Sequence, residues 1–597
     1  MESSVKTIND VFYTVIERNA PRVLMYKQRV KWIPLSAREL YRNVVGTARA
    51  LESWGVGPGD RVALLSENRP EWAIADFATM LLGAADVPIY PTLTPEQTAY
   101  MLNDSGAKVV FVSTHDQMRK VLAIKSQTKI EHVVIMDYIG TPEAIPMHRL
   151  MHAGPIDRDR EFDRRAKAVD PDAMATIIYT SGTTGTPKGA ILTQGNLASN
   201  LFHSLDFYQF TARDLSLSFL PLSHITARHL DYAMYWHGVV VAYCPFIDEL
   251  MLSLLEVKPT VFVAVPRVYE KIYNNVQQKI GPAGMKRKLY NWALSVGRVH
   301  RDEVYAGQTP RDPEWRLANR LLFSKIRKGL GGRVEVFISG GAPLNPDLQD
   351  WYASVGLRIF EGYGLTETSP VIALNNPKAY RARSVGKPLA NLEVKIAEDG
   401  ELWVKGPSIF KGYWNMPVET AEAFEDGWFK TGDIANIDSD GFLYITDRKK
   451  DLIKTSGGKF VAPQPIEASL KTSDFVAEAA MIGDKRKFAV VIIAPNFATL
   501  EDWARQNGVQ YSDREELVNH PRVQALYREV VAGTNARLAQ FEKIKKILLV
   551  ADEFTVANGA LTPTLKLRRR VIESRYRNRI EDLYSSASTT SEVVSAT

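Results

Sequence analysis

Apolar positions recur with two different periods along the first 150 residues of the chain. Residues 37–54 and 71–82 carry apolar side chains at helical spacing, on one face of each segment. Residues 61–65 and 107–112 are short runs dominated by aliphatic and β-branched side chains, which is typical of buried strands. Because helices and strands alternate, we expect a layered α/β domain built on a mostly parallel sheet.

Three further apolar strands are predicted, and each runs directly into a loop rich in glycine and polar residues. The strands are residues 177–179, 334–338 and 357–360, and their loops follow at 180–189, 339–343 and 361–368. In open α/β sheets, ligands bind beyond the carboxyl ends of the strands. The three loops are therefore predicted to line one site.

The first of these loops has the composition of a phosphate-binding loop. It contains hydroxyls, glycines and a lysine, namely Thr180, Ser181, Gly182, Thr183, Thr184, Gly185, Thr186 and Lys188. Glycines let backbone N–H groups converge on an anion, and the hydroxyls and the lysine add donors and charge. The Walker A pattern, started at Gly182, would place Pro187 where the second glycine belongs. We therefore expect a different kind of phosphate loop, and the alternative is a flexible Gly/Thr linker.

Composition narrows the class of protein. The 597 residues are too many for one core, and 45% hydrophobic with 24% charged residues describes an ordinary globular chain. The net charge of +6 is weak support for an anionic partner, and no nucleic acid is expected. The lone cysteine, Cys244, excludes an internal disulfide. The N-terminus lacks a secretory signal pattern and no apolar run approaches the roughly 20 residues of a membrane span, so we expect a cytoplasmic protein.

Changes in the sequence pattern divide the chain into predicted domains. From about residue 383, short strands and turns at 392–396 and 402–404 predict a small β-rich subdomain. A charge run at 446–451 marks a break before a second mixed α/β stretch. We therefore predict an N-terminal domain of layered α/β subdomains at 1–446 and a small mobile C-terminal α/β domain at 447–584. The Ser/Thr-rich tail at 585–597 lacks aromatic residues and is predicted to be disordered.

Residues 267–333 form a helical and basic segment, with 15 Lys and Arg against 5 Asp and Glu. Aromatic and aliphatic residues are interleaved with the cations. One interpretation is a solvated helical face over an ordinary core. The other is a peripheral contact with an anionic membrane, where each cation near the surface contributes about 1 kcal/mol.

Six residue blocks in a fixed order carry a resemblance to a known family. The blocks occupy 179–189, 340–342, 363–367, 426–433, 447–450 and 562–566. This order closely resembles the acyl-adenylate-forming superfamily and, within it, the long-chain fatty-acid–CoA ligases. The resemblance extends from about residue 35 to residue 570. It implies that a fatty carboxylate attacks the α-phosphate of ATP and that coenzyme A then accepts the acyl group.

The resemblance also assigns roles in the N-terminal domain. It implies that the first loop holds the pyrophosphate end of ATP, with Lys188 as a clamp. The adenine would lie against Tyr363. Gly341 and Ala342 would leave room for the base, and Gly364 continues the block that contains Tyr363. Thr366 would donate to a phosphate, and Glu367 would bind Mg²⁺ through a carboxylate oxygen.

Further roles fall in the C-terminal part and at the acyl site. The resemblance implies that Asp433 and Arg448 reach the ribose or phosphate, and that Lys566 stabilises the attacking carboxylate and the phosphorus. Asp447 would be the hinge between two half-reactions, and Gly457 and Gly458 would line the channel for CoA.

His224 matches the family's position near the acyl chain. Some bacterial relatives carry a tryptophan four residues later, proposed to gate the acyl tunnel. Here that position is Arg228, and a guanidinium cannot replace an indole in an apolar gate. The gate is therefore not carried over to this chain.

Two alternative functions remain open at this stage. A fatty-acyl-AMP ligase that transfers to a carrier protein shares almost every motif, and an assay with both acceptors separates the two. A non-catalytic nucleotide- or lipid-binding protein is the other alternative, against which Glu367 and Lys566 both argue. The oligomeric state and the preferred chain length cannot be read from the sequence.

Overall fold

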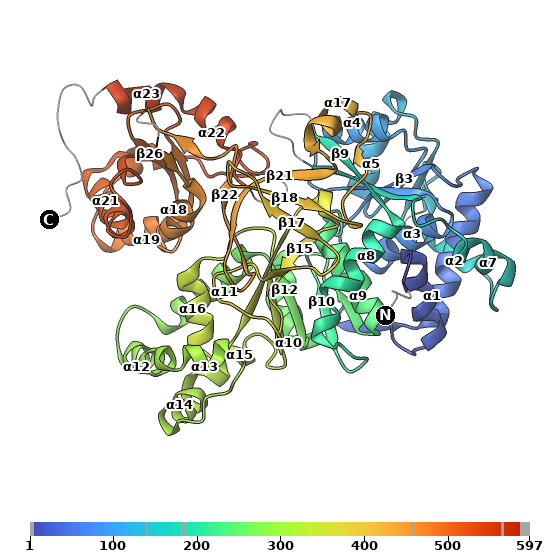
Figure 1. Cartoon of the computed structure of the whole chain (residues 1–597), viewed down its shortest axis with the longest axis horizontal. Helices are drawn as coiled ribbons and strands as arrows, with labels where there is room; N and C mark the ends of the chain where they lie inside the picture. The colour runs from blue at the N-terminus through green and yellow to red at the C-terminus, as the bar shows by residue number, and fades with distance from the viewer. Residues whose placement is uncertain (1–4, 139, 181–186, 457–458, 563–565, 586–597) are drawn as a thin grey trace. The chain divides into compact units, whose positions relative to one another are not determined.

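The computed structural model describes residues 5–138, 140–180, 187–456, 459–562 and 566–585 (Figure 1). The chain divides into two compact units. The first comprises residues 1–397, 402–431 and 437–444, and the second comprises residues 398–401, 432–436 and 445–597. The predicted boundary at 446/447 stays a prediction, and the predicted disordered tail lies almost entirely outside the described residues.

The first unit contains an eight-stranded sheet that is parallel in its main part. Its order is β19 (Gly412–Tyr413), β9 (Lys188–Thr193), β8 (Met174–Thr180), β4 (Ala85–Ile89), β3 (Arg61–Leu65), β5 (Val109–Val112), β6 (His132–Ile135) and β7 (Ile145–Pro146). From β8 to β7 all neighbours are parallel, whereas β9 and β19 are antiparallel. The predicted strands at 61–65, 107–112 and 177–179 are all confirmed.

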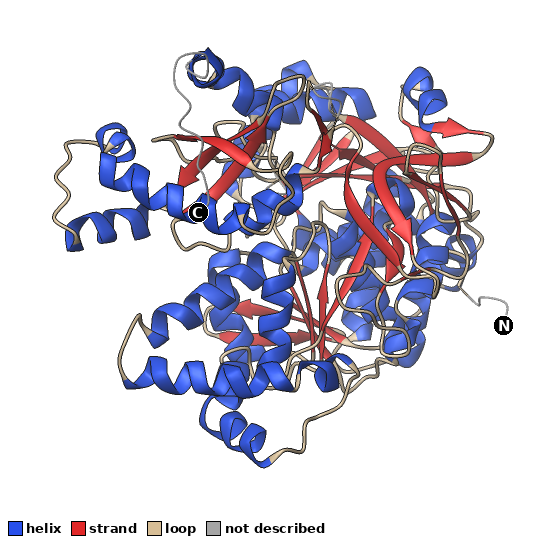
Figure 2. Cartoon of the chain, turned by 60° about the vertical axis from the view of Figure 1, so that its left-hand side comes forward, coloured by secondary structure: helices blue, strands red, loops and turns tan. Residues whose placement is uncertain are grey.

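A nine-stranded sheet forms the second layer of this unit. Its order is β16 (Lys387–Pro388), β15 (Val371–Leu374), β14 (Ile359–Gly364), β13 (Val336–Ser339), β12 (Val261–Ala264), β10 (Leu215–Ser218), β11 (Val240–Tyr243), β1 (Leu24–Gln28) and β2 (Lys31–Leu35). Five neighbouring pairs, from β1–β11 to β13–β14, are parallel. Helices cover the sheets, as the blue and red ribbons of Figure 2 show.

The helices of the first unit follow the predicted alternation. Their bounds are α1 (Ile8–Arg18), α2 (Ala37–Ser53), α3 (Pro70–Leu81), α4 (Pro95–Ser105), α5 (His115–Ile124), α6 (Met147–His152), α7 (Arg160–Lys167), α8 (Gln194–Ser204), α9 (Ile225–His237), α10 (Leu250–Val257), α11 (Pro266–Ile280), α12 (Met285–Val299), α13 (Arg301–Tyr305), α14 (Pro313–Ala318), α15 (Ser324–Lys328), α16 (Pro346–Ser354) and α17 (Pro417–Ala423). The predicted helices at 37–54 and 71–82 are α2 and α3. A capping box starts α2: the Ser36 hydroxyl accepts from the Glu39 N–H, and the Glu39 carboxylate accepts from the Ser36 N–H.

Helices α8 and α9 form a layer between the two sheets. Helix α8 contacts β9 of one sheet and β15 of the other. In α9, Arg228 bonds to Asp86 of β4 and Thr176 of β8, while the helix also packs on β10 and β11. The α8–α9 layer therefore contacts both sheets, and His224 lies at the start of α9.

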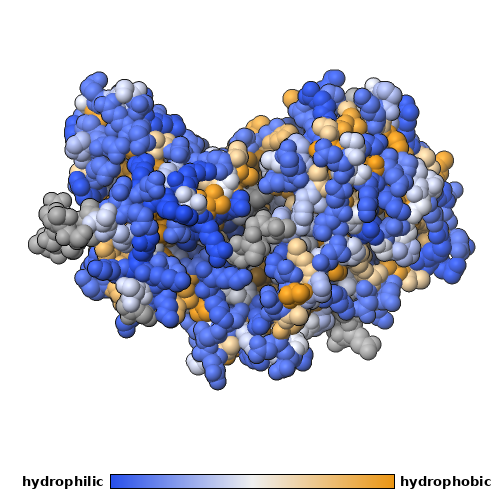
Figure 3. Space-filling view, turned by 90° about the horizontal axis from the view of Figure 1, so that it is seen from above, coloured by the Kyte–Doolittle hydropathy of each residue, from blue (hydrophilic) through white to orange (hydrophobic). Residues whose placement is uncertain are grey.

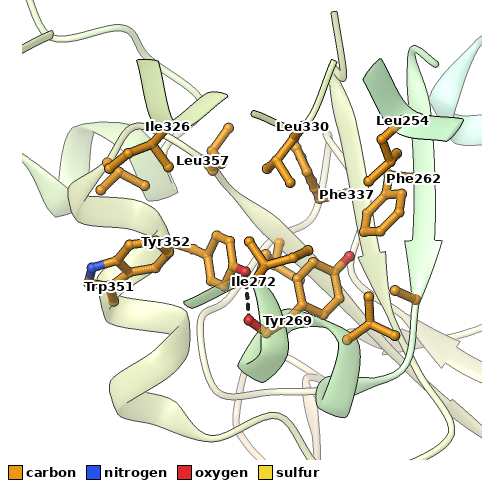
Figure 4. Packing of buried hydrophobic residues seen from close by; sticks show 14 of the residues in the cluster. Leu254, Phe262, Tyr269, Ile272, Ile326, Leu330, Phe337, Trp351, Tyr352 and Leu357 are labelled. Carbon is orange, nitrogen blue, oxygen red and sulfur yellow. Dashed lines mark hydrogen bonds between the residues drawn. The ribbon is translucent and has the colours of Figure 1, made fainter. Parts of the chain in front are cut away.

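Several aromatic residues of the basic segment 267–333 are buried in the core beside the second sheet. In Figure 4, Tyr269 of α11 packs between Phe262 and Tyr352, and the Tyr352 hydroxyl donates to the Tyr269 carbonyl at 2.9 Å. Other aromatic residues of the segment, Tyr290, Trp315 and Phe323, belong to the same buried cluster. For these residues the interpretation as a solvated face over an ordinary core is the one that the packing supports.

The β-rich region and the second unit complete the chain. A five-stranded sheet contains β17 (Glu393–Ile396), β18 (Glu401–Lys405), β20 (Phe424–Glu425), β21 (Trp428–Ile437) and β22 (Leu443–Arg448). The second unit then contains β23 (Ile453–Lys454), β24 (Phe460–Val461), α18 (Pro463–Leu470), β25 (Val476–Ile482), β26 (Ala489–Pro495), α19 (Phe497–Gln506), α20 (Arg514–Asn519), α21 (Pro521–Asn535), β27 (Ile544–Leu549), α22 (Arg569–Arg575) and α23 (Arg577–Ser585). This confirms the expected α/β fold with a C-terminal α/β domain.

The first half of one predicted loop, 361–368, proved to be strand. The segment expected to loop from residue 361 continues β14 to Gly364 and pairs antiparallel with β15. A Cβ on Gly364 would lie 1.7 Å from the Pro370 carbonyl oxygen, so this backbone approach requires glycine. In the sequence, Gly362 and Gly364 resembled loop residues, because no neighbouring residue reveals how closely β15 approaches them.

Candidate active site

The predicted phosphate loop connects two antiparallel strands. Thr180 ends β8, Lys188 begins β9, and the two residues are paired in the ladder. The Thr180 hydroxyl donates to the Lys188 carbonyl oxygen at 3.4 Å. Outside the described residues lie Ser181, Gly182, Thr183, Thr184, Gly185 and Thr186. The ladder therefore holds both ends of the loop at the carboxyl end of β8.

Tyr413 connects this loop to the Thr366-Glu367 block. The Lys188 ammonium lies over the Tyr413 ring, 5.2 Å from its centroid. The hydroxyl of the same ring donates to Glu367 Oε1 at 2.9 Å. The cation and the carboxylate that are predicted to act on ATP thus lie against one aromatic side chain.

The sequence analysis missed Tyr413. The residue lies on the short strand β19, which pairs with β9, and the Trp414 N–H donates to the Gly189 carbonyl at 2.7 Å. The Tyr413 N–H donates to the Thr420 hydroxyl at 2.9 Å, which fixes the strand from its other side. The available signal was the Gly-Tyr-Trp run in a polar stretch, since two adjacent aromatic residues need a packing partner.

Thr366 and Glu367 begin the short turn η5 (Thr366–Thr368), and both are buried. The Phe410 N–H donates to the Glu367 carbonyl at 2.9 Å, and Asn200 of α8 donates to the last carbonyl of the turn at 3.1 Å. A buried carboxylate requires a donor or a cation close by. The Tyr413 hydroxyl supplies that donor to Glu367.

The predicted adenine-side residues lie on two neighbouring strands: Gly341 and Ala342 after β13, and Tyr363 and Gly364 at the end of β14. Because β13 and β14 are parallel, these segments share one edge of the sheet. A Cβ on Gly340 would lie 3.5 Å from the Gly362 carbonyl oxygen, so the segments are in contact. Gly341 has φ of +81°, and the nearest atom to a Cβ there would be Val265 Cγ1 at 3.7 Å, an ordinary contact. A glycine at position 341 therefore permits the positive φ of the turn and leaves space beside the backbone.

Glu361 is a buried carboxyl group that the sequence analysis did not single out. It lies on β14, two residues before Tyr363, and accepts a hydrogen bond from Gln349 Nε2 at 3.0 Å. Burial raises the pKa of Glu361 to about 8, against the opposing effect of hydrogen bonds from Leu344 N–H and Gln349. A neutral, hydrogen-bonded carboxyl group therefore stands behind the edge that carries Tyr363. An acidic residue inside an otherwise apolar strand pattern was the available signal.

His224 is the N-cap of α9, and its Nδ1 accepts from the Thr226 N–H at 3.2 Å. The loop before it is anchored at two points. Asn68 Oδ1 accepts from the Leu222 N–H at 3.1 Å, and the Ser223 hydroxyl donates to the Ile89 carbonyl at 3.1 Å. His224 is thus held by the start of a buried helix, on the eight-stranded sheet's side of the unit.

Arg228 is fully buried and does not resemble a gate. Its Nη2 lies 2.8 Å from both Asp76 Oδ1 and Asp86 Oδ2, and its Nη1 donates to Thr176 Oγ1 at 2.9 Å. The guanidinium also lies over the Trp72 ring, 5.3 Å from its centroid. Burial raises the pKa of Asp86, which reduces the excess of negative charge around one cation. Arg228 is therefore enclosed by the fold, and no gate of the acyl tunnel is assigned to it.

In the second unit, Asp433 and Arg448 form an ion pair on neighbouring strands, β21 and β22. Arg448 Nε lies 3.3 Å from Asp433 Oδ1, with the aspartate side chain 4% exposed and the arginine side chain 46% exposed. Lys449 pairs with Glu401 at 2.9 Å beside them. The buried carboxylate is fixed, and the guanidinium remains open to solvent on one side.

Lys566 is exposed, and its backbone pairs with Thr562. The Thr562 hydroxyl accepts from the Lys566 N–H at 3.0 Å, and the Thr562 N–H donates to the Lys566 carbonyl at 2.8 Å. Three residues farther on, Arg569 pairs with Glu467 of α18 and donates to the Met481 carbonyl at 2.6 Å. Arg569 is a second residue that the sequence analysis passed over, and it anchors the segment that presents Lys566.

Asp447 is buried rather than solvated. Its Oδ1 accepts from the Arg448 N–H at 2.6 Å, and its Oδ2 accepts from the Gln464 N–H at 3.4 Å, in the first turn of α18. Burial raises the pKa of Asp447 to about 7, while these two N–H groups act in the opposite direction. Outside the described residues lie Gly457 and Gly458, the predicted CoA-channel residues.

Within the described ranges, no group of three or more His, Cys, Asp and Glu side chains is placed to hold a metal ion. Glu367, the predicted Mg²⁺ ligand, therefore belongs to no such group among these residues. Likewise, no helix in the described part of the chain is long and apolar enough to cross a membrane.

Comparison with known families matches almost the whole chain. Residues 14–414 match the family described as AMP-binding enzyme, and residues 450–588 match the AMP-binding enzyme C-terminal domain. Long-chain-fatty-acid–CoA ligase FadD15 of Mycobacterium bovis is 36% identical over 584 residues, covering 95% of this chain and 96% of the relative. Long-chain-fatty-acid–CoA ligase 1 of Homo sapiens is 30% identical over 592 residues, covering 94% and 83%.

Solved structures share the fold. The anthranilate CoA ligase AuaEII in complex with anthranoyl-AMP superposes with a TM-score of 0.75 at 20% identity, covering 96% of this chain and 98% of that one. ATP-bound MatB from Rhodopseudomonas palustris superposes with a TM-score of 0.70 at 24% identity, covering 96% and 99%.

Proposed function

The chain belongs to the AMP-binding enzyme family, and from that membership we propose that it is an ATP-dependent long-chain fatty-acid–CoA ligase. In the first half-reaction a fatty carboxylate oxygen attacks the α-phosphorus of ATP, and pyrophosphate leaves. In the second, the CoA thiol attacks the acyl carbon, and AMP leaves as the acyl-CoA forms. The protein supplies position and charge in both steps rather than a covalent nucleophile.

The arrangement of Lys188, Tyr413 and Glu367 carries the proposal. A cation over one face of the ring and a carboxylate bonded to its hydroxyl bring together residues that lie 179 positions apart in the sequence, 367 minus 188. This arrangement suits a triphosphate, because the lysine compensates phosphate charge and the carboxylate can hold a phosphate-bound cation. Full-length similarity to long-chain fatty-acid–CoA ligases supports the substrate class.

On the ATP side, Lys188 and the loop that precedes it would hold the pyrophosphate end of the nucleotide. Thr366 would donate its hydroxyl to a phosphate oxygen. Tyr363 would stack on the adenine, with Gly341 and Ala342 leaving space at the neighbouring strand end. The contact between the two strand ends supports a shared adenine pocket.

Glu367 fits a Mg²⁺ ligand. Mg²⁺ in nucleotide enzymes is commonly bound by one or two carboxylates together with substrate phosphates, so a buried carboxylate that Tyr413 connects to Lys188 matches its donor set. When bound, the ion would compensate charge on the phosphates. The chain's own contribution is to hold the Glu367 carboxylate in one orientation through Tyr413.

In the second unit, Asp433 would accept from the ribose hydroxyls and Arg448 would reach the ribose or phosphate. Lys566 would stabilise charge on the attacking carboxylate and the phosphorus during adenylation. Asp447 would serve as the hinge between a domain at 1–446 and a domain at 447–584, and Gly457 and Gly458 would line the CoA channel.

The acyl chain would lie near His224, and the protein would act in the cytoplasm or at a membrane surface. The tie between His224 and the buried α9 supports a rigid rather than adaptable position for this residue.

An assay of purified protein with both acceptors tests the proposal. With ATP, Mg²⁺, a long-chain acid and CoA, we expect acyl-CoA, AMP and pyrophosphate in equal amounts. Transfer only to a phosphopantetheinylated carrier protein would identify a fatty-acyl-AMP ligase instead. ATP binding without any pyrophosphate release would identify a non-catalytic binding protein.

A further inference from the structure

Two buried asparagines of the first unit, Asn68 and Asn200, each hold the backbone of a segment beside predicted site residues. Polar side chains normally lie at the surface, as the largely hydrophilic face in Figure 3 shows. A buried amide is stable only when its oxygen and its N–H groups find partners. For both asparagines the partners include backbone groups of a segment more than 150 positions away in the sequence.

Asn68 lies between β3 and α3 and holds the loop that leads to His224. Its Nδ2 donates to the Leu220 carbonyl at 2.7 Å, and its Oδ1 accepts from the Leu222 N–H at 3.1 Å. The same Nδ2 donates to the hydroxyl of Ser218, the last residue of β10, at 3.3 Å. One amide therefore fixes the loop at several points, the last of them two residues before His224.

The loop that Asn68 holds crosses from one sheet to the other. It follows β10 of the nine-stranded sheet, whereas Asn68 follows β3 of the eight-stranded sheet. The Ser223 hydroxyl donates to the carbonyl of Ile89, the last residue of β4, and β4 is the parallel neighbour of β3. The loop is thus held at the carboxyl ends of two parallel strands, which is where ligands bind in open α/β sheets.

Asn200 lies on α8 and holds the segment that follows Thr366 and Glu367. Its Nδ2 donates to the Thr368 carbonyl at 3.1 Å and to the Val371 carbonyl at 2.7 Å. Its Oδ1 accepts from the Val371 N–H at 3.1 Å. One amide therefore joins the end of η5 to the start of β15.

The backbone between these two contacts is unfavourable. Ser369 has φ of +69°, in the left-handed region that a residue with a Cβ rarely adopts. Such a conformation persists only where the surroundings enforce it, and Asn200 holds the segment on both sides of Ser369. Without these bonds we expect the segment to relax and to move the turn that presents Glu367.

We propose that Asn68 and Asn200 are positioning residues for different substrates. Asn68 fixes the loop before His224 and so sets the affinity for the carboxylic acid. Asn200 fixes the turn that carries Thr366 and Glu367 and so sets the affinity for ATP with Mg²⁺. The identity of the two substrates rests on the proposed function, and neither asparagine has to touch a substrate for this role.

Two matched variants test the division between the substrates. Asn68→Asp and Asn200→Asp each keep an oxygen that accepts from the N–H of the held segment, and each lose the Nδ2 donor. Asn68→Asp should raise the KM for hexadecanoic acid about tenfold, the effect of roughly one buried hydrogen bond, and leave the KM for ATP within about twofold. Asn200→Asp should do the reverse. Initial rates of acyl-CoA formation, with one substrate varied and the others saturating, measure both constants.

Asn9 provides the control for the loss of a buried amide donor. It lies on α1 and donates to the Met80 carbonyl at 3.2 Å and to the Ala166 carbonyl at 2.8 Å, on two helices that carry no predicted site residue. Asn9→Asp should lower the thermal stability and leave both KM values unchanged.

Hydrogen exchange on the full-length protein tests the positioning without reference to catalysis. Asn68→Asp should speed amide exchange in the segment 219–224, and Asn200→Asp should speed it in the segment 366–371. Each variant should leave the other segment unchanged. If an aspartate variant does not fold, Asn68→Ser or Asn200→Ser replaces it, since serine keeps a hydroxyl donor.

Three results would overturn the proposal. Both KM values could rise together in each variant, which indicates a general loss of structure. Exchange could stay unchanged in the held segment, or it could rise there while the matching KM stays the same. If the unmodified protein forms no acyl-CoA, the proposed function fails instead, and hydrogen exchange still decides whether each asparagine holds its own segment.

Discussion

Two Asp–Arg sites of the molecule, one around Arg228 and one around Arg448, have the same chemistry and opposite surroundings. In the first unit, Arg228 is fully enclosed by Asp76, Asp86 and Thr176. In the second unit, Arg448 contacts the buried Asp433 but is 46% exposed. A charge that protein groups enclose on every side is not accessible to a ligand. A charge that stays half exposed to solvent can still meet a ligand.

This comparison separates anchoring from binding, although sequence treats the two arginines alike. Arg228 occupies the position at which the resemblance would place a gate of the acyl tunnel, yet its bonds tie α9 to α3 and to the eight-stranded sheet. Arg448 lies in a charge run that could be read as ordinary surface, yet its partner is fixed and its outer side is open. Burial of the cation, rather than its neighbours in sequence, distinguishes the roles.

The largest effect is expected from breaking the enclosed site. Arg228→Ala leaves two buried carboxylates without their cation, and such a loss typically costs about 3–5 kcal/mol. Urea unfolding of the first unit, followed by tryptophan fluorescence, measures the change. The triple variant Asp76→Asn/Asp86→Asn/Arg228→Met removes all charges and should recover much of the loss. A cost below about 1 kcal/mol for Arg228→Ala would show that the site is not an anchor.

An exposed cation should behave in the opposite way, with a large effect on catalysis and little on stability. Lys566→Ala should lower the rate of acyl-AMP formation by about 10²–10³, the usual cost of one lost charge-stabilising donor. Thioester formation from supplied acyl-AMP should be spared. The control Arg577→Ala removes another exposed cation of the same unit. Equal losses in both half-reactions would contradict the role assigned to Lys566.

Glu361 extends the comparison to a buried carboxyl group that accepts hydrogen bonds from two neutral donors, the Leu344 N–H and the Gln349 amide. Between its ordinary pKa of 4.5 and its raised pKa of about 8, the folded state keeps a proton that the unfolded state releases. The free energy of unfolding therefore falls as pH rises through this window. Glu361→Gln keeps an acceptor for Gln349 and removes the titration.

The pH curve decides the Glu361 prediction. We expect the variant and the parent to have similar stability near pH 5. Near pH 8.5 the variant should be more stable, by an amount on the order of 2 kcal/mol. Thermal unfolding at several pH values measures the difference, and parallel curves for the two proteins would contradict the assignment.

The smallest effect on stability is expected at the open pair. Arg448→Ala should change the free energy of unfolding by less than about 1 kcal/mol, because the guanidinium is half exposed and solvent screens it. The same change should raise the KM for ATP several-fold if Arg448 meets the ribose or phosphate. Arg448→Lys, which keeps the charge without the planar fork, should recover part of the loss. An unchanged KM would remove Arg448 from the site.

Much of the site was visible in the sequence because its chemistry is local. Thr180, Lys188, Thr366 and Glu367 lie in short blocks whose residue types suggest phosphate and cation binding. Tyr413, which joins two of these blocks, was not visible, because it acts through contacts with residues far away in the chain. Arg569 and Glu361 were missed for the same reason.

The sequence by itself determined the α/β class, the strands at 61–65 and 177–179, and the helices α2 and α3, because periodicity and capping act over a few residues. It also determined the family, through the order of six blocks. Only the tertiary structure decided that Arg228 is an anchor, that β14 continues to Gly364, and that Tyr413 joins Lys188 to Glu367. Those features depend on which distant surfaces cover which side chains, and burial is a property of the packed chain rather than of any local segment.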